Sequence, residues 1–203
     1  MTDRMDHPIR YPVRDGELWL LENFLEPSEA DRLFHRMQQN IPWKQEKITV
    51  FGKTHPIPRL TCWHGDPGCA YTYSGLRSEP EPWTEELRMI RARLQDILPH
   101  PDFNSVLLNF YRSGEEKMGW HADDERELGP DPVIASVSLG ATRRFDLKHR
   151  RHADQRLSIP LPTGSLLVMA GALQHHWVHQ LPAQKKVTAG RINLTFRHIR
   201  KSN

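Results

Sequence analysis

The sequence has few cysteines and no long apolar segment. Its two cysteines, Cys62 and Cys69, lack the spacing of a metal-binding finger, and the first ten residues lack the apolar core of an export signal. No stretch approaches the roughly 20 consecutive apolar residues that a helix needs to span a bilayer. These absences argue against a membrane protein and favour the reducing cytoplasm, where we expect a soluble protein.

Neither sign of charge dominates, and no internal repeat or low-complexity tract divides the chain. The net charge is only +3, so a polyanionic partner must be met by a local basic patch. A length of 203 residues suits one domain with a sizeable core, and nothing in the composition demands two. We predict a single domain over 1–203 and take a monomer as the default state.

Two helical patterns precede a series of short β-rich runs. The first helix opens at Pro27 and Ser28, and the second is capped by Thr84 and extends to about Ile97. Apolar residues at helical spacing form one face of each: Ala30, Leu33, Phe34 and Met37 in the first helix, and Leu87, Ile90, Leu94 and Ile97 in the second. We interpret both faces as packing surfaces that cover a sheet.

Strand-forming residues occur in short runs along the chain and dominate its second half. In the first half, a short strand is predicted at 17–21, and a hairpin over 46–61 with Val50, Phe51 and Gly52 at its tip. From Phe103 onward six further runs follow: NSVLLNFY, VIASVSL, RRFDLKH, RLSIPL, GSLLVMA and RINLTFR. Two helices followed by many closely spaced antiparallel strands indicate an α+β fold, namely a two-sheet jelly roll (double-stranded β-helix) with the N-terminal helices packed outside.

The most informative motif is the H-x-D pair of His121 and Asp123, with His179 far downstream. Residues i and i+2 of a strand point the same way, so a third ligand from a facing strand would complete a site of two imidazoles and one carboxylate. Such a set occupies one face of Fe(II) and leaves positions for a chelating co-substrate and O2. H-x-D alone is a weak signal, because a solvated loop histidine beside acids is commoner. His175 and His176 are less favoured alternatives for the distal ligand.

The run RINLTFR carries a polar face opposite an apolar one. Arg191, Asn193, Thr195 and Arg197 alternate with Ile192, Leu194 and Phe196. An ordinary half-solvated strand is one interpretation, but two arginines on an inward face would be costly unless they met anions, which a dicarboxylate that chelates iron supplies. Asn109 and Tyr111 in NFY also share a face, which is either an ordinary polar strand face or a pair of donors aimed at the metal cavity.

As an ensemble, these residues resemble the AlkB-like Fe(II)/2-oxoglutarate dioxygenases, a family that repairs alkylated bases oxidatively. The resemblance covers roughly Val50 to Ile199. It rests, in this order, on PRLTCWHGD, YTYSGL, NFY, HADDERELGP, PVIASVSLGATRRF, HHWVHQLP and RINLTFR. It is closest to the branch that repairs double-stranded DNA, because VFGK, HADDEREL and the KKV after HQLP occur in matching places.

The resemblance implies a role for each residue of the metal and co-substrate site. His121, Asp123 and His179 correspond to the iron ligands, and Arg191 would pair with the distal carboxylate of 2-oxoglutarate. Arg197 would be a catalytic residue that lies between Asp123 and the metal-proximal end of 2-oxoglutarate. The other residues expected to bind 2-oxoglutarate are Asn109, Tyr111, Asn193 and Thr195.

The implied activity is oxidative demethylation of DNA bases such as 1-methyladenine and 3-methylcytosine. It would use Fe(II), 2-oxoglutarate and O2, and it would release formaldehyde, succinate and CO2. The partner would be DNA, double- or single-stranded, with the alkylated base flipped out of the stack. The same chemistry on RNA or protein is an open alternative. A non-catalytic nucleic-acid-binding module is another, although it predicts loss of a ligand or of Arg191, and neither is lost.

A nucleotide-recognition region is expected at about 45–80. Phe51 would enter the base stack as a wedge, and Tyr73 of YTYSGL, with Tyr71 nearby, would stack on the flipped base. Asp124 and Glu125 would accept hydrogen bonds from an exocyclic amine of that base. The bland alternatives are a small core under the hairpin for Phe51, a strand aromatic for Tyr73 and simple solvent exposure for the two acids.

Several basic residues would hold the DNA backbone. The candidates for phosphate or substrate contact outside the base pocket are Gly52, Lys53, Arg59, Lys185 and Lys186, although surface lysines are usually just solvated. Gln184 stands where close relatives carry an arginine. The resemblance therefore predicts a weaker grip on the opposite strand.

Overall fold

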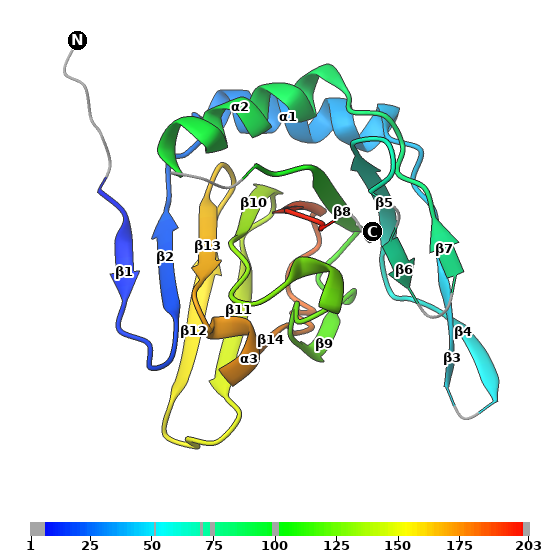
Figure 1. Ribbon diagram of the computed structural model, residues 1–203. Coiled ribbons are helices and arrows are strands. Elements are labelled where there is room, and N and C mark those ends of the chain that lie inside the picture. The colour runs from blue at the N-terminus through cyan, green and yellow to red at the C-terminus, as the bar shows by residue number, and fades with distance from the viewer. Residues whose placement is uncertain (1–6, 51, 70, 74–75, 99–101, 201–203) are drawn as a thin grey trace, which may run out of the picture.

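Two antiparallel sheets face each other in the computed structural model, which describes residues 7–50, 52–69, 71–73, 76–98 and 102–200 (Figure 1). The larger sheet has the strand order β1 (Ile9–Tyr11), β2 (Glu17–Leu21), β13 (Leu166–Ala170), β10 (Ile134–Gly140), β15 (Arg191–Arg197), β8 (Ser105–Tyr111) and β5 (Leu60–Gly65). The smaller sheet has the order β12 (Arg156–Leu161), β11 (Arg143–His149), β14 (Trp177–Leu181) and β9 (Met118–His121). This arrangement confirms the predicted jelly roll.

Two helices cover the outer face of the larger sheet, at the top of Figure 1. Helix α1 (Pro27–Asn40) begins at the predicted proline. Helix α2 (Glu85–Ile97) is capped as predicted, because Thr84 Oγ1 accepts a hydrogen bond from the backbone N–H of Leu87 at 3.3 Å. Both helices bury their apolar faces against the sheet. Ile97 is the exception, since it lies at the end of α2 with 43% of its surface exposed.

The alternation along the strands divides the core into two layers. On β15, Ile192, Leu194 and Phe196 pack toward α1 and α2. A second cluster fills much of the space between the two sheets and includes Phe145 and Leu181 of the smaller sheet. The side chains of β15 that do not face the helices therefore point into the interior between the sheets, where a polar site needs partners.

Two short ribbons lie beyond β5. The hairpin of β3 (Lys47–Val50) and β4 (Lys53–Pro56) matches the predicted one, and Gly52 in its turn has φ +75°, a left-handed conformation that favours glycine. The second ribbon pairs β6 (Tyr71–Tyr73) with β7 (Leu76–Ser78). In Figure 1 both lie on the side of the molecule away from β1.

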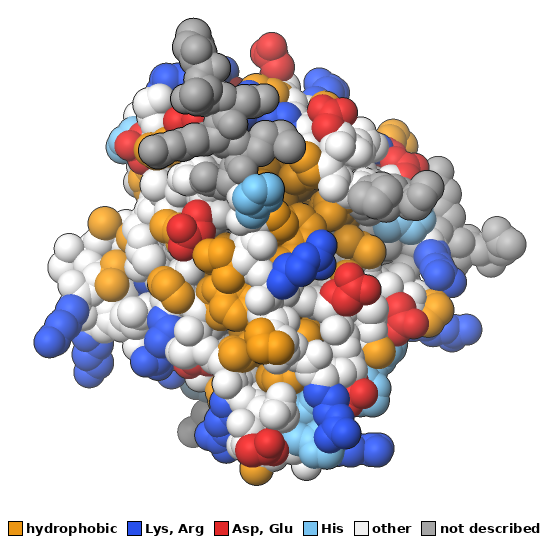
Figure 2. Space-filling model, turned by 90° about the vertical axis from the view of Figure 1, so that its left-hand side faces the viewer, with side chains coloured by type: hydrophobic (Ala, Val, Ile, Leu, Met, Phe, Trp, Pro, Cys, Tyr) orange, Lys and Arg blue, Asp and Glu red, His pale blue; other side chains and the backbone are white. Residues whose placement is uncertain are grey.

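The opposite side, seen in Figure 2, carries a band of hydrophobic side chains between charged ones. Ile9, on the edge strand β1, contributes to the exposed apolar surface with 44% of its own surface accessible.

Among the described residues, no helix is both long and apolar enough to cross a bilayer. A short helix α3 (Leu173–His176) and a single 3-10 turn (Arg126–Leu128) complete the elements that surround the site.

Candidate active site

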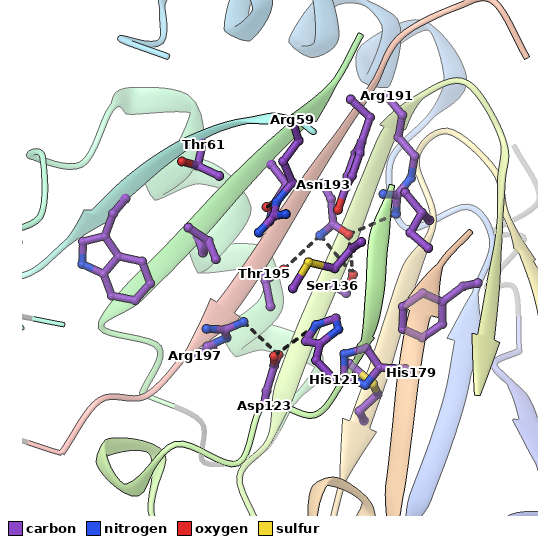
Figure 3. Close-up of a pocket in the computed structure, with 18 of the residues that line it drawn as sticks. Arg59, Thr61, His121, Asp123, Ser136, His179, Arg191, Asn193, Thr195 and Arg197 are labelled. Carbon is purple, nitrogen blue, oxygen red and sulfur yellow. Dashed lines mark hydrogen bonds and ion pairs between the residues drawn. The ribbon is translucent and has the colours of Figure 1, made fainter. Parts of the chain in front are cut away.

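A pocket opens between the two sheets, and strands from both contribute its walls. The larger sheet supplies the polar face of β15 together with residues of β5, β8, β10 and β13, and the smaller sheet supplies residues of β9, β11 and β14. Figure 3 shows the charged and polar side chains that converge there. The polar stripe predicted for RINLTFR thus faces an enclosed space rather than bulk water.

His121, Asp123 and His179 lie at one end of this pocket. His121 ends β9 and is paired across the ladder with His179 of β14, while Asp123 lies two residues past the end of β9. One ligand atom from each of the three residues lies within 4.8 Å of the others. The backbone N–H of Asp123 donates to Gln174 Oε1 at 2.9 Å, so a buried glutamine of α3 anchors the segment that carries the carboxylate.

Hydrogen bonding, burial and neighbouring charges each prepare one of the three residues to bind a cation. His121 Nδ1 donates to the carbonyl of Gly119 at 2.8 Å, so in the neutral tautomer the lone pair lies on Nε2. Burial lowers the pKa of His179 to about 3, so its imidazole is neutral. Burial opposes ionisation of Asp123, but the guanidinium of Arg197 and the two imidazoles outweigh it and hold the pKa of that carboxyl below its usual value.

Arg197 ties the carboxylate to β15. Its NH2 group donates to Asp123 Oδ2 at 2.9 Å, and both side chains are almost wholly buried. Because Oδ2 is occupied by Arg197, Oδ1 is the oxygen that remains on the side of the imidazoles, 3.8 Å from His121 Nε2. Two imidazoles and one carboxylate on one side of a cavity are the donor set of mononuclear ferrous sites.

Arg191 lies at the other end of the pocket with only 1% of its surface exposed. Its NH2 group donates to Ser138 Oγ at 3.0 Å and to Asn193 Oδ1 at 3.1 Å. Within the described part of the chain, its buried Nε has no hydrogen-bond partner and no carboxylate pairs with it. Burial lowers the pKa of Arg191 to about 10, which still leaves the group charged at neutral pH. A buried cation with an unused donor suits an anionic ligand.

Asn109, Tyr111 and Thr195 complete the polar wall between the two ends. All three line the pocket, and Asn109 is paired with Asn193 across the β8–β15 ladder. Burial raises the pKa of Tyr111, so its phenol keeps its proton and acts as a donor. Asn193 itself is engaged on both sides, because Nδ2 donates to Ser136 Oγ and Thr195 Oγ1 while Oδ1 accepts from Arg191.

The sequence of residues 17–197 matches the family model of the 2OG-Fe(II) oxygenase superfamily. The chain belongs to the 2OG-Fe(II) oxygenase superfamily. Its cofactors are accordingly Fe(II), 2-oxoglutarate and O2. The site fits them, because three potential ligand atoms converge at one end of the pocket and a buried arginine with an unused donor lies at the other.

Proteins of the AlkB group are among the relatives of this oxygenase, as the sequence motifs predicted. The rat alpha-ketoglutarate-dependent dioxygenase alkB homolog 3 is 39% identical over 93% of this chain and 66% of its own length. Human DNA oxidative demethylase ALKBH2 is 41% identical over 85% of this chain and 69% of its own length. The solved structure of OsALKBH1 superposes with a TM-score of 0.66 at 20% identity, covering 94% of this chain and all of that one, and supports the fold.

The acidic residues beside the ligand pair differ in whether their side chains face the pocket. His121, Asp123 and Glu125 line the pocket, whereas Asp124 points outward and forms an ion pair with Arg150 at 3.1 Å. The predicted contacts of Asp124 and Glu125 with the base stay predictions, and Glu125 is the one of the two that lines the pocket. Successive side chains of an extended segment point to opposite sides, so only one of two neighbouring acids can face the cavity.

The residues predicted to contact phosphate lie in two different places, inside the pocket and on the exposed surface. Arg59 is only 6% exposed, lines the pocket, and donates from Nε to Asn109 Oδ1 at 2.6 Å, which corrects its expected place against a DNA phosphate. Lys185 and Lys186 are exposed in the loop between β14 and β15, outside the pocket. Gly52 is exposed in its hairpin turn.

Four predicted substrate residues fall wholly or partly outside the described part of the chain. Phe51 is not described at all, and for Lys53, Tyr71 and Tyr73 the structure describes the backbone in β4 and β6 but not the side chain. Their predicted contacts stay predictions.

Several pocket residues were not predicted from the sequence, including Glu46, Thr61, Trp63 and Ser136. Thr61 and Trp63 are two residues apart on β5, so the alternation rule would have placed them on one face if that strand had been predicted. Ser136 lies on β10 opposite Thr195, a pairing that only the tertiary structure defines.

A second histidine cluster does not suit a metal. Asp15, His149 and His152 bring potential ligand atoms within 4.8 Å of one another. However, His149 Nδ1 accepts hydrogen bonds from the backbone N–H groups of Arg151 and His152, both at 3.1 Å. The ring must then carry its hydrogen on Nε2, where it donates to Asp15 Oδ2 at 3.1 Å, so neither nitrogen has a lone pair to offer.

Proposed function

We propose that this oxygenase removes methyl groups from alkylated DNA bases, with 1-methyladenine and 3-methylcytosine as preferred lesions. The observation that carries the proposal is the convergence of the H-x-D…H residues and a buried arginine in one pocket. The similarity to a DNA oxidative demethylase at 41% identity supports DNA as the substrate. The whole of 1–203 would act as one monomeric domain, with a nucleotide-recognition region at about 45–80.

His121, Asp123 and His179 would hold the iron, and Arg191 would bind the distal carboxylate of 2-oxoglutarate. When bound, the iron with 2-oxoglutarate and O2 supplies oxidative hydroxylation of a methyl group, with succinate and CO2 as co-products and formaldehyde released from the hydroxymethyl base. Arg197 keeps Asp123 ionised and oriented through the 2.9 Å contact. Tyr111 would add a further donor to the co-substrate from the polar wall.

The target base would be flipped into the mouth of the pocket, because a methylated Watson–Crick nitrogen is inaccessible inside a duplex. Glu125 and Glu46 line the pocket and bring negative charge to it. Methylation at these nitrogens makes adenine and cytosine cationic, so carboxylates favour the damaged base over its neutral parent. The ring of Trp63 offers a flat apolar surface on the same wall.

The direct test supplies purified protein with Fe(II), 2-oxoglutarate, ascorbate and methylated oligonucleotides, single- and double-stranded DNA and RNA in parallel. Mass spectrometry should detect loss of the methyl group from DNA, and omission of 2-oxoglutarate should abolish it. Asp123→Ala serves as the inactive control. Conversion of 2-oxoglutarate to succinate with no demethylation of any DNA substrate would refute the assignment to DNA while leaving the oxygenase chemistry intact.

A further inference from the structure

Arg59 precedes β5, and its side chain turns into the pocket. Its Nε donates to Asn109 Oδ1 at 2.6 Å, in a buried contact between residues 50 positions apart in the sequence. Asn109 lies in β8, with Thr61 as its neighbour on β5 and Asn193 as its neighbour on β15. In Figure 3, Arg59 and Asn193 lie close together along the polar wall of the pocket.

The contact with Arg59 determines which end of the Asn109 amide faces the ligand. A guanidinium donates hydrogen bonds and accepts none, so only the amide oxygen of Asn109 can meet it. The Nδ2 group is thereby turned away from Arg59. No described residue accepts a hydrogen bond from Asn109 Nδ2, and this atom is not fully buried. Since Asn109 lines the pocket, its two N–H donors are open to a bound molecule.

Asn193, the neighbouring amide on the pocket floor, has a different role. Its Nδ2 group already donates to Ser136 Oγ at 3.2 Å and Thr195 Oγ1 at 3.0 Å, and its oxygen accepts from Arg191. It therefore supports Arg191 and has little hydrogen-bonding capacity left for a ligand. Of the two asparagines, Asn109 is the one that can donate to the co-substrate.

We propose that Arg59 is a positioning residue for 2-oxoglutarate, which it serves by holding the Asn109 amide with its N–H groups toward the co-substrate. This inference rests on the proposed function, because it takes the 2-oxoglutarate site as given. Without Arg59, the amide is free to turn by half a rotation about its last torsion. It would then present an oxygen atom to the carboxylate of the co-substrate, and two acceptors repel each other.

The test compares the affinity for 2-oxoglutarate with the affinity for DNA, measured separately. Calorimetry with the Mn(II)-loaded protein should show that Arg59→Met binds 2-oxoglutarate about five- to tenfold more weakly, as expected for loss of one oriented hydrogen bond. In turnover, KM for 2-oxoglutarate should rise by a similar factor, while kcat at saturation stays near the wild-type value. Arg88→Met, which removes an exposed arginine of α2, controls for the lost charge.

A double-mutant cycle identifies the route of the effect. If Arg59 acts through Asn109, then Arg59→Met adds almost nothing to the loss of affinity already caused by Asn109→Ala. Additive losses would overturn the inference. So would a weakened and less salt-dependent DNA affinity with unchanged 2-oxoglutarate binding, which would return Arg59 to a phosphate contact. Failure of the wild-type protein to bind 2-oxoglutarate would instead refute the proposed function itself.

A third variant keeps the inference testable if Arg59→Met does not fold, as judged by its melting curve. Asn109→Asp preserves the acceptor that Arg59 needs but removes both N–H donors, so it should bind 2-oxoglutarate more weakly although the arginine contact is intact. Unchanged affinity in Asn109→Asp would show that the donors of Asn109 are not used, and the inference would fall.

Discussion

Gln184→Arg would supply the basic residue that the family resemblance leads one to expect in the loop before β15, yet we expect it to destabilise the protein. Gln184 Oε1 accepts hydrogen bonds from the backbone N–H of Arg144 at 2.7 Å and from Arg143 Nε at 3.3 Å. Arg143 is fully buried, and its other donors bind three backbone carbonyls: those of Ser113, Glu116 and Pro182. An arginine at 184 has no acceptor atom and would bring a second cation to this buried guanidinium.

The size of the effect follows from the contacts that are lost. A buried donor left without a partner costs about 1–3 kcal/mol, and the charged Arg143 lies at the upper end of that range while the N–H of Arg144 is nearer to solvent. Together they correspond to a loss of about 2–4 kcal/mol in the free energy of unfolding. For a domain of this length, such a loss lowers Tm by roughly 5–15 °C.

Urea unfolding and thermal melting measure this loss, and DNA affinity at several salt concentrations is measured on the same samples. Gln184→Glu is the matched control, because it keeps the acceptor and should melt near the wild-type temperature. Lys185→Gln changes the charge of the same loop without touching Arg143. A Gln184→Arg protein with wild-type Tm and tighter DNA binding would refute the reasoning and return position 184 to the DNA grip.

Three further outcomes are expected. Asp123→Asn removes the anionic ligand and the ion pair with Arg197, so formaldehyde release should be abolished while fluorescence anisotropy finds most of the DNA affinity retained, since phosphate contacts lie elsewhere. Phe51→Ala should slow repair of duplex DNA more than repair of single strands, and equal slowing of both would remove the case for a wedge. Burial lowers the pKa of His64 below its ordinary 6.5, so the unfolded chain takes up a proton that the folded one does not as pH falls through 6.5. Stability should then decline below that pH, and the slope of unfolding free energy against pH should be shallower in His64→Gln; an unchanged slope would assign the decline to other groups.

Much of the fold was predictable because its signals are local. Thr84 and the apolar spacing after it placed α2 within a residue of its observed bounds, and RINLTFR alternated as β15 does. Ile97 was wrong as a packing residue because the buried face of α2 continues from Leu94 to Leu98, four residues on, which leaves the side chain of Ile97 on the exposed side. The H-x-D pair was expected on a strand or its loop, but the bounds of β9 were not predicted, since the four residues Met118–His121 carry no run of β-branched side chains.

Within the site, the sequence by itself determined which residue types were present and which of them share a face, because alternation depends only on neighbours along the chain. His121, Asp123 and the polar side of β15 were found in this way. Only the tertiary structure decided what stands opposite them. The contacts of Arg59 with Asn109, of Gln184 with Arg143 and of Asp124 with Arg150 join residues that are 50, 41 and 26 positions apart. Whether such a side chain meets solvent, DNA or another part of the protein depends on how the strands pair and the sheets pack, and no local pattern encodes that.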